Sequence, residues 1–214
     1  MHLRRMPEAK SNILASPLVF AEKDSLSLAG HWQKTFCKNN HIRLEIGMGK
    51  GRFITAAAVA DPDNNYLGLE FREEMVWIAL KRLVGNEPDN LRFIWANAAL
   101  LGEMFNQGEI ATIYLNFSDP WPKPRHAKRR LTHAAFLRIY HQILSAGGEL
   151  LFKTDNRAFF DWSLTQIPEM LWQKVAVSYD LPLAQDALMT EYEERYRLRG
   201  QAIYFFHLSK KEEL

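Results

Sequence analysis

Residues 42–53 read I-R-L-E-I-G-M-G-K-G-R-F, and this stretch decides the fold. Its first five residues alternate between apolar and polar side chains, which is the pattern of a half-buried strand. Glycines then occupy alternate positions from Gly47 through Gly49 to Gly51, and apolar residues recur at helical spacing from Phe53 to Ala60. The stretch therefore predicts a strand, a glycine turn and a helix in that order.

The alternation of strands and helices continues after residue 60. We expect further strands at residues 66–70, 91–95, 111–117 and 149–153, with helices between them. This order predicts an α/β protein with an open, mostly parallel sheet and helices on both faces. Residues 1–40 show no strong period, so we expect an N-terminal arm or lead-in there and one domain over residues 41–214.

Composition limits the class of protein and its surroundings. The 214 residues are 47% hydrophobic and 24% charged, which favours one globular domain over a disordered, collagen-like or coiled-coil chain. Cys37 is the lone cysteine and no Cys/His cluster has zinc-ligand spacing, so we expect a reducing compartment and no metal. No run approaches the ~18 apolar residues of a membrane span, so we expect a cytoplasmic protein with no membrane partner.

The distribution of charge carries more information than its total. Lys and Arg number 27 and Asp and Glu 25, so the net charge of +2 gives no argument for nucleic acid. Residues 123–130, however, read K-P-R-H-A-K-R-R, with five formal positive charges and no carboxylate. Such a run is either a solvated face or a contact for phosphates.

The glycine turn is a candidate cofactor loop, because missing side chains let the backbone turn tightly and approach a ligand. It is not the dinucleotide fingerprint, since Arg52 stands three positions after Gly49, and it is not a phosphate-binding P-loop, since Gly51 follows Lys50. Glu70 ends the next predicted strand, where an acidic side chain accepts hydrogen bonds from ribose hydroxyls. A structural turn and a surface glutamate are the alternatives.

With the acidic start at Glu45, these features resemble class I S-adenosylmethionine-dependent methyltransferases, which have a Rossmann-like fold with a seven-stranded sheet. Asn97 follows the strand predicted at residues 91–95, where that class places a polar residue beside adenine. A helix N-cap is the alternative for Asn97.

Residues 116–130, N-F-S-D-P-W-P-K-P-R-H-A-K-R-R, combine an acid, an aromatic ring and a cationic run at the end of a predicted strand. The segment is similar to the D-P-W-x-K-x-R-H-x-K-R-R motif of the tRNA (guanine-N7)-methyltransferases. A strand-end T-D at Thr154 and Asp155 and a T-x-Y-E at residues 190–193 extend the resemblance, which runs from Arg43 to Tyr204.

The resemblance implies transfer of a methyl group from S-adenosylmethionine to N7 of guanine 46 in the variable loop of tRNA, with S-adenosylhomocysteine as the second product. It implies a monomer or homodimer whose macromolecular partner is tRNA. Asp119 would be catalytic. The residues implied for the cofactor are Glu45, Gly47, Gly49, Gly51, Glu70, Asn97 and Asp119; for the substrate Lys123, Asp155, Thr190, Glu191, Tyr192 and Glu193; for RNA Arg125, His126, Ala127, Lys128, Arg129 and Arg130.

The chemistry agrees with this assignment. Guanine N7 carries a free lone pair at neutral pH, so no base is needed and catalysis can be mostly positioning. Alkylation makes the ring cationic and strengthens the N–H donors of its Watson–Crick edge, so a carboxylate there binds the transition state better than the ground state. Asp119 or Asp155 could supply this carboxylate.

Several alternatives stay open at this point. Asp155 could cap a helix, and residues 190–193 could begin a solvated charged helix. A methyltransferase acting on another RNA base, typically with a D-P-P-Y type turn, and a catalytically silent RNA-binding module of the same fold are the rival functions. The D-P-W-P at residues 119–122 argues against the first, and the intact Glu45, glycines and Glu70 argue against the second.

Overall fold

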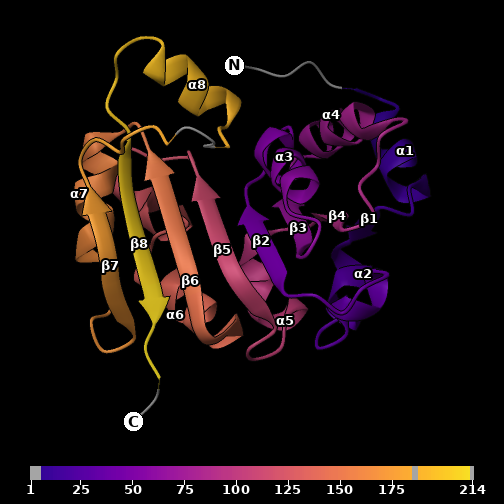
Figure 1. Cartoon of the computed structure of the whole chain (residues 1–214), viewed down its shortest axis with the longest axis horizontal. Helices are drawn as coiled ribbons and strands as arrows, with labels where there is room; N and C mark the ends of the chain where they lie inside the picture. The colour runs from indigo at the N-terminus through magenta and orange to yellow at the C-terminus, as the bar shows by residue number, and fades with distance from the viewer. Residues whose placement is uncertain (1–5, 185–187, 213–214) are drawn as a thin grey trace. The chain divides into compact units, whose positions relative to one another are not determined.

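The computed structural model describes residues 6–184 and 188–212 (Figure 1). The chain forms two compact units, Met1–Phe105 (unit 1) and Asn106–Leu214 (unit 2). Within the described ranges there are eight strands, four in each unit. No helix in those ranges is long and apolar enough to cross a membrane.

Unit 1 contains a wholly parallel set of strands in the order β1-β4-β3-β2. Its strands are β1 (Val19–Ala21), β2 (Ile42–Ile46), β3 (Asn65–Glu70) and β4 (Leu91–Trp95). Its helices are α1 (Ala9–Ala15), α2 (Glu22–Ser27), α3 (Arg52–Ala60), α4 (Glu73–Leu83) and α5 (Leu101–Met104), with 3-10 turns η1 (Trp32–Thr35) and η2 (Ala98–Leu100).

The strand, glycine turn and helix expected from residues 42–53 are confirmed as β2, a loop and α3. β2 pairs in register with β3, so that Leu44 lies opposite Leu67. Every residue of β3 is buried, as expected of a strand covered on both faces. The apolar face of α3, including Ile54 and Ala58, is buried as well.

Residues 1–40, expected as a lead-in, contain α1, β1, α2 and η1 in their described part. Trp32 is fully buried, stacks on Phe105 with ring centroids 5.4 Å apart, and contacts the ring of Phe20 edge-on at 5.5 Å. Its indole N–H donates to the carbonyl of Met104 at 2.8 Å. The segment thus supplies both a strand and a core residue to unit 1.

Unit 2 has the strand order β5-β6-β8-β7, in which β5 and β6 are parallel and β8 is antiparallel to both its neighbours. Its strands are β5 (Ile110–Asn116), β6 (Leu144–Thr154), β7 (Trp172–Ser178) and β8 (Tyr204–Lys210). Its helices are α6 (Ala134–Ile143), α7 (Arg157–Thr165) and α8 (Glu191–Arg197), with the 3-10 helix η3 (Pro124–Arg129). In Figure 1, α8 lies at the end of unit 2 where β5 and β6 finish.

The core of unit 2 is built on aromatic rings from strands and a helix. Phe152 of β6 lies 4.8 Å from the ring of Phe206 on β8 and contacts Phe159 of α7 edge-on at 5.4 Å. All three side chains are buried. Burial of such rings contributes a large share of folding free energy, so this cluster fixes α7 against β6 and β8.

The α/β class and the mostly parallel pairing are confirmed, since β8 is the strand that pairs antiparallel with its neighbours in the described residues. The expected number of seven strands is wrong, because the described residues contain eight. Three strands, β1, β7 and β8, lie outside the five ranges that the pattern located, and the shortest of them, β1, has three residues and pairs with β4. Three residues are too few to show a period of two, so the pattern gave no sign of it.

We expect Trp32→Ala to lower the free energy of unfolding by about 3–5 kcal/mol, because it removes a buried ring and leaves a cavity. Chemical denaturation measures the change. Leu14→Ala in the same segment is the control, since Leu14 is 56% exposed, and its effect should stay within about 0.5 kcal/mol. A loss below about 1 kcal/mol for Trp32→Ala would show that residues 1–40 add little to unit 1.

Candidate functional site

The loop after β2 explains why glycines alternate there. Gly47, Gly49 and Gly51 all have left-handed backbones, with φ of 78°, 56° and 72°. The N–H groups of Gly47 and Met48 both donate to the carbonyl of Leu69 on β3, at 2.8 and 3.1 Å. Only glycine adopts this conformation without cost, so the three glycines let the chain turn at once from β2 into α3.

Two of these glycines face different surroundings. A Cβ atom on Gly51 would lie 2.9 Å from the Cβ of Ala79, so Gly51 allows α3 to begin close to α4. A Cβ atom on Gly49 would meet nothing within 4 Å. Gly49 therefore leaves open space beside the backbone, as a cofactor loop requires, and the residues present fit a bound nucleoside.

Glu70 ends β3 and ties the loop to the strand end. Its Oε2 accepts a hydrogen bond from Gly49 N–H at 3.1 Å, and its Oε1 accepts from Phe71 N–H and Arg72 N–H at 2.9 and 3.0 Å. The side chain is only 6% exposed, and burial raises the pKa of this carboxyl although the amide hydrogen bonds oppose the shift. A carboxylate has lone pairs for further donors, so Glu70 can still accept from ribose hydroxyls.

Glu45 and Asn97, the other cofactor residues expected in unit 1, differ in exposure. Glu45 is buried near the end of β2, opposite Gly68 of β3. Asn97 is exposed, and its Oδ1 accepts a hydrogen bond from Ala99 N–H at 2.9 Å. The N-cap alternative for Asn97 is thus confirmed, and a contact of its amide with adenine stays a prediction.

Phe71 was missed by the sequence reasoning. It follows Glu70 directly and its side chain is 62% exposed. Its carbonyl accepts a hydrogen bond from the indole N–H of Trp95 at 3.2 Å, which fixes the backbone there. An aromatic residue immediately after a strand-end acid is the sequence signal that could have found it.

In unit 2, Asp119 lies in a turn with two unusual backbones. Phe117 and Trp121 have φ of 52° and 40°, and they are the non-glycine residues with positive φ in the described chain. Such conformations are costly for bulky residues and concentrate at functional sites. Asp119 is exposed, while the hydroxyl of Ser118 is buried without a hydrogen-bond partner in the described residues.

The basic run at residues 123–130 divides into two groups. Lys123, Arg125, Lys128 and Arg129 are exposed and available to phosphates. Arg130 instead points into the unit, where its guanidinium lies 4.2 Å from the ring centre of Trp162 and its Nη2 donates to the carbonyl of Trp121 at 3.1 Å. Arg130 therefore anchors the segment that carries the other cations.

Aromatic contacts order the rest of the run, which forms η3. The half-buried His126 contacts the ring of Trp121 edge-on at 5.6 Å, and the guanidinium of Arg129 lies 5.1 Å from the same ring. Ala127 is half-buried and its carbonyl accepts the N–H of Arg130 at 3.1 Å. Trp121 thus packs against two members of the run it precedes.

Asp155 follows the last residue of β6 and is half-buried. The helix-cap alternative for Asp155 is wrong, because the cap of α7 is Asn156, whose Oδ1 accepts from Phe159 N–H at 2.9 Å. The carboxylate of Asp155 is therefore not used to cap α7. Burial and the neighbouring carboxylate of Asp155 raise the pKa of Tyr196 on α8.

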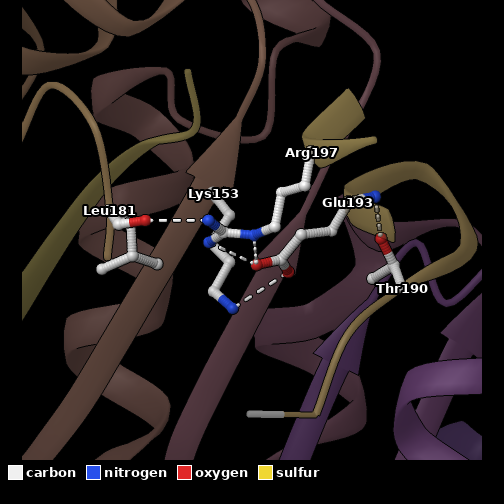
Figure 2. Close-up of polar contacts among 5 residues, drawn as sticks. All are labelled: Lys153, Leu181, Thr190, Glu193 and Arg197. Carbon is white, nitrogen blue, oxygen red and sulfur yellow. Dashed lines mark hydrogen bonds and ion pairs between the residues drawn. The ribbon is translucent and has the colours of Figure 1, made fainter. Parts of the chain in front are cut away.

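Glu193 has contacts that its sequence position did not predict (Figure 2). It is 1% exposed, and its Oε2 accepts from Nζ of Lys153 on β6 at 3.1 Å. Its Oε1 accepts from Nε and Nη2 of Arg197 at 3.1 and 2.9 Å, and Arg197 also donates to the carbonyl of Leu181 at 2.9 Å. A guanine contact for Glu193 stays a prediction, and both its oxygens are already engaged.

The other members of residues 190–193 form the first turn of α8. Thr190 is the N-cap, and its Oγ1 accepts from Glu193 N–H at 3.0 Å. Glu191 is half-buried, whereas Tyr192 is 49% exposed and stacks on Tyr196 with ring centroids 6.5 Å apart. Of these residues, Tyr192 has the exposed aromatic ring.

Metal ligands are not grouped in the described part of the chain. No set of three or more His, Cys, Asp or Glu side chains there could hold a metal ion.

Comparison with solved structures defines the class of protein. The chain is similar to the crystal structure of the 16S rRNA methyltransferase KamB, with a TM-score of 0.63 and 12% identity over 90% of this chain and 95% of that one. At that identity the similarity concerns the fold. Together with the glycine loop and Glu70, it defines a class I S-adenosylmethionine-dependent methyltransferase fold.

Sequence comparison narrows the class to a family. A family model described as "Putative methyltransferase" matches residues 39–206. The chain is 44% identical to the tRNA (guanine-N(7)-)-methyltransferase of Lysinibacillus sphaericus, over 95% of each chain, and 46% identical to that of Brevibacillus brevis, over 95% and 96%. The chain belongs to the tRNA (guanine-N(7)-)-methyltransferase family.

The raised pKa of Glu70 predicts a pH dependence of stability. Between the usual value of 4.5 and the raised value, the folded state binds more protons than the unfolded state, so the free energy of unfolding falls as pH rises. Glu70→Gln removes this titration. We expect the stability of the wild type relative to Glu70→Gln to decrease with rising pH across that interval, as measured by urea denaturation at a series of pH values.

Glu103→Gln is the matched control in the same unit, because Glu103 is exposed on α5. Its difference from the wild type should vary much less over the same pH series. A difference between the wild type and Glu70→Gln that is flat, or that grows with pH, would contradict the burial of a charged Glu70.

Proposed function

We propose that this chain transfers the methyl group of S-adenosylmethionine to N7 of guanine 46 in the variable loop of tRNA. The sulfonium S–CH3 bond breaks, an N7–CH3 bond forms, and the products are N7-methylguanosine in tRNA and S-adenosylhomocysteine. The observation that carries the proposal is the turn at Asp119, an exposed acid between two left-handed residues and directly before exposed cations, in a chain of this family.

All the cofactor residues of the proposal except Asp119 lie in unit 1. S-adenosylmethionine supplies the methyl group and its sulfur leaving group. The open backbone at Gly49 lies against it, Glu70 accepts hydrogen bonds from its ribose, and the amide of Asn97 reaches its adenine. Phe71, exposed beside Glu70, adds an apolar surface for the same nucleoside.

Unit 2 carries the substrate residues of the proposal. Asp119 or Asp155 accepts hydrogen bonds from the Watson–Crick edge of guanine, whose donors strengthen as the ring becomes cationic. Neither carboxylate has to remove a proton, because N7 is already nucleophilic, so these groups act by position and charge. The exposed Lys123 and Tyr192 lie on the substrate side in this proposal.

The RNA contact of the proposal rests on the exposed cations Lys123, Arg125, Lys128 and Arg129. They bind phosphates, and such contacts fix the position of the RNA without reading its sequence. Arg130 holds the segment in place through Trp162 and Trp121. In this proposal the enzyme is cytoplasmic and acts as a monomer or homodimer.

Methyl transfer from labelled S-adenosylmethionine to unmodified tRNA tests the proposal. We expect label in a tRNA with guanine at position 46 and none in the same tRNA with adenine there, because adenine 46 presents neither the guanine edge nor its donors. Label in both would move the target to another base. Cofactor binding without label in either would favour the catalytically silent RNA-binding module.

The exposed cations predict how tRNA binding depends on salt. Lys128→Gln should lower the magnitude of the slope of log K against log[salt] by about 1, because one phosphate contact and its counterion release are lost. Filter binding across a salt series measures the slope. Lys174→Gln on β7 is the control, since Lys174 is a partly exposed cation paired with Glu169 at 3.8 Å, and an equal change in both variants would contradict the assignment.

A further inference from the structure

The residues at positions 190–193, T-E-Y-E, have different surroundings in α8. Thr190 caps the helix, because its Oγ1 accepts a hydrogen bond from Glu193 N–H at 3.0 Å. Glu193 is 1% exposed, whereas Tyr192 is 49% exposed. Thr190 and Glu193 thus build and attach the helix, and the ring of Tyr192 is the one that a ligand can reach.

Two cations enclose the carboxylate of Glu193 (Figure 2). Nζ of Lys153 on β6 donates to Oε2 at 3.1 Å, and Nε and Nη2 of Arg197 donate to Oε1 at 3.1 and 2.9 Å. The side chains of Lys153 and Arg197 are themselves only 16% and 18% exposed. A carboxylate enclosed in this way cannot meet the N–H edge of a base unless α8 moves away from β6.

Lys153 also holds the turn that leads to Asp119. Its backbone carbonyl accepts the N–H of Phe117, which follows β5, at 2.9 Å. The ring of Phe117 stacks on Tyr196 of α8, with centroids 6.0 Å apart and planes at 28°. Lys153 therefore contacts α8 through its side chain and the segment before Asp119 through its backbone.

Arg197 completes the attachment of the carboxylate. It donates to the carbonyl of Leu181 at 2.9 Å as well as to Glu193. A buried carboxylate that loses one of its cations is left with uncompensated charge, which is strongly unfavourable, so the three charged side chains act as a unit. Because Tyr192 precedes Glu193 directly, a displacement of Glu193 displaces the exposed ring as well.

We propose that Lys153 and Arg197 are positioning residues for the methyl transfer, which act through Glu193 by fastening α8 to β6 and so hold the ring of Tyr192 in place. Glu193 itself does not contact guanine. The inference rests on the proposed function, in which Tyr192 lies on the substrate side. The charge of Glu193 is needed only as the partner of the two cations.

Lys153→Met removes one cation and keeps an unbranched side chain in its place. We expect kcat/KM for tRNA methylation to fall about tenfold to a hundredfold, since a misplacement of about 1 Å can cost that much. The Kd for S-adenosylmethionine should stay as in the wild type, because the loop after β2 and Glu70 are unchanged. Lys174→Met on β7 is the matched control, since Lys174 is a partly exposed cation paired with Glu169 at 3.8 Å, and it should keep wild-type kcat/KM. An unchanged kcat/KM in Lys153→Met would overturn the proposal.

Replacing all three charges separates positioning from a contact with guanine. In Lys153→Met/Glu193→Leu/Arg197→Met, apolar side chains fill the site, and buried ion pairs are often replaced in this way without loss of stability. If Glu193 only fastens α8, this variant regains most of the kcat/KM that Lys153→Met loses. A variant that unfolds at the wild-type temperature and is no more active than Lys153→Met would show that the carboxylate itself is needed, and the proposal would be wrong.

Substrate discrimination tests the same point without the triple variant. Hypoxanthine at position 46 lacks the exocyclic amine of guanine, and a site that accepts a hydrogen bond from this amine discriminates against its absence. If Glu193 does not contact the base, Glu193→Gln lowers kcat/KM for both substrates by the same factor. A smaller preference for guanine in Glu193→Gln than in the wild type would assign the carboxylate to the base and overturn the proposal.

Hydrogen exchange tests the attachment of α8 without turnover. We expect its amides, such as the N–H of Leu198 that is bonded to the carbonyl of Glu194 at 3.0 Å, to exchange at least about tenfold faster in Lys153→Met than in the wild type. The amides of α6 should not change, which excludes a general loss of folding. Unchanged exchange in α8 would overturn the attachment. If exchange rises as expected and wild-type protein transfers no methyl group to tRNA, the proposed function is wrong and the attachment stands.

Discussion

A parallel strand has to leave its sheet at the carboxyl end and turn at once, and this constraint shapes the candidate residues of both units. In unit 1 the turn after β2 uses three glycines with left-handed backbones, and a Cβ atom on Gly49 would meet nothing within 4 Å. In unit 2 the turn after β5 uses Phe117 and Trp121, for which the same region of backbone space is costly. The glycines leave room for a ligand beside the backbone. The two aromatic residues need packing contacts that offset the cost of their backbone conformation.

Those partners explain much of the packing in unit 2. Phe117 stacks on Tyr196, and Trp121 packs against His126 and Arg129. The carbonyl of Trp121 is held by Arg130, whose guanidinium lies over Trp162. The contacts that offset the backbone cost are therefore the ones that order the turn around Asp119 and the cationic run after it.

The buried carboxylate of Glu193 is the second determinant of this region. An unpaired charge at 1% exposure would be strongly unfavourable, and here Lys153 and Arg197 supply cations and hydrogen bonds to both oxygens. The group fastens α8 to β6. Because α8 also carries Tyr192 and Tyr196, the ion pairs fix the position of these aromatic side chains as well.

The sequence by itself determined the local elements and the chemical character of the site. Periods of two and 3.6 residues, the alternating glycines and the D-P-W-P turn are short-range patterns, and they predicted the α/β class, the loop after β2 and the family. Family membership and the fold class are confirmed by relatives and by a solved structure. The roles of individual residues stay predictions.

Only the tertiary structure decided which of several chemically equivalent neighbours does what. Asn156 rather than Asp155 caps α7, Arg130 anchors while Arg129 stays exposed, and Glu193 binds cations instead of closing its own capping box. β1 forms a strand because its backbone pairs with β4. The physical reason is the same throughout: these choices depend on groups distant in sequence, such as Lys153 for Glu193, and local pattern carries no record of which distant segments the fold brings together.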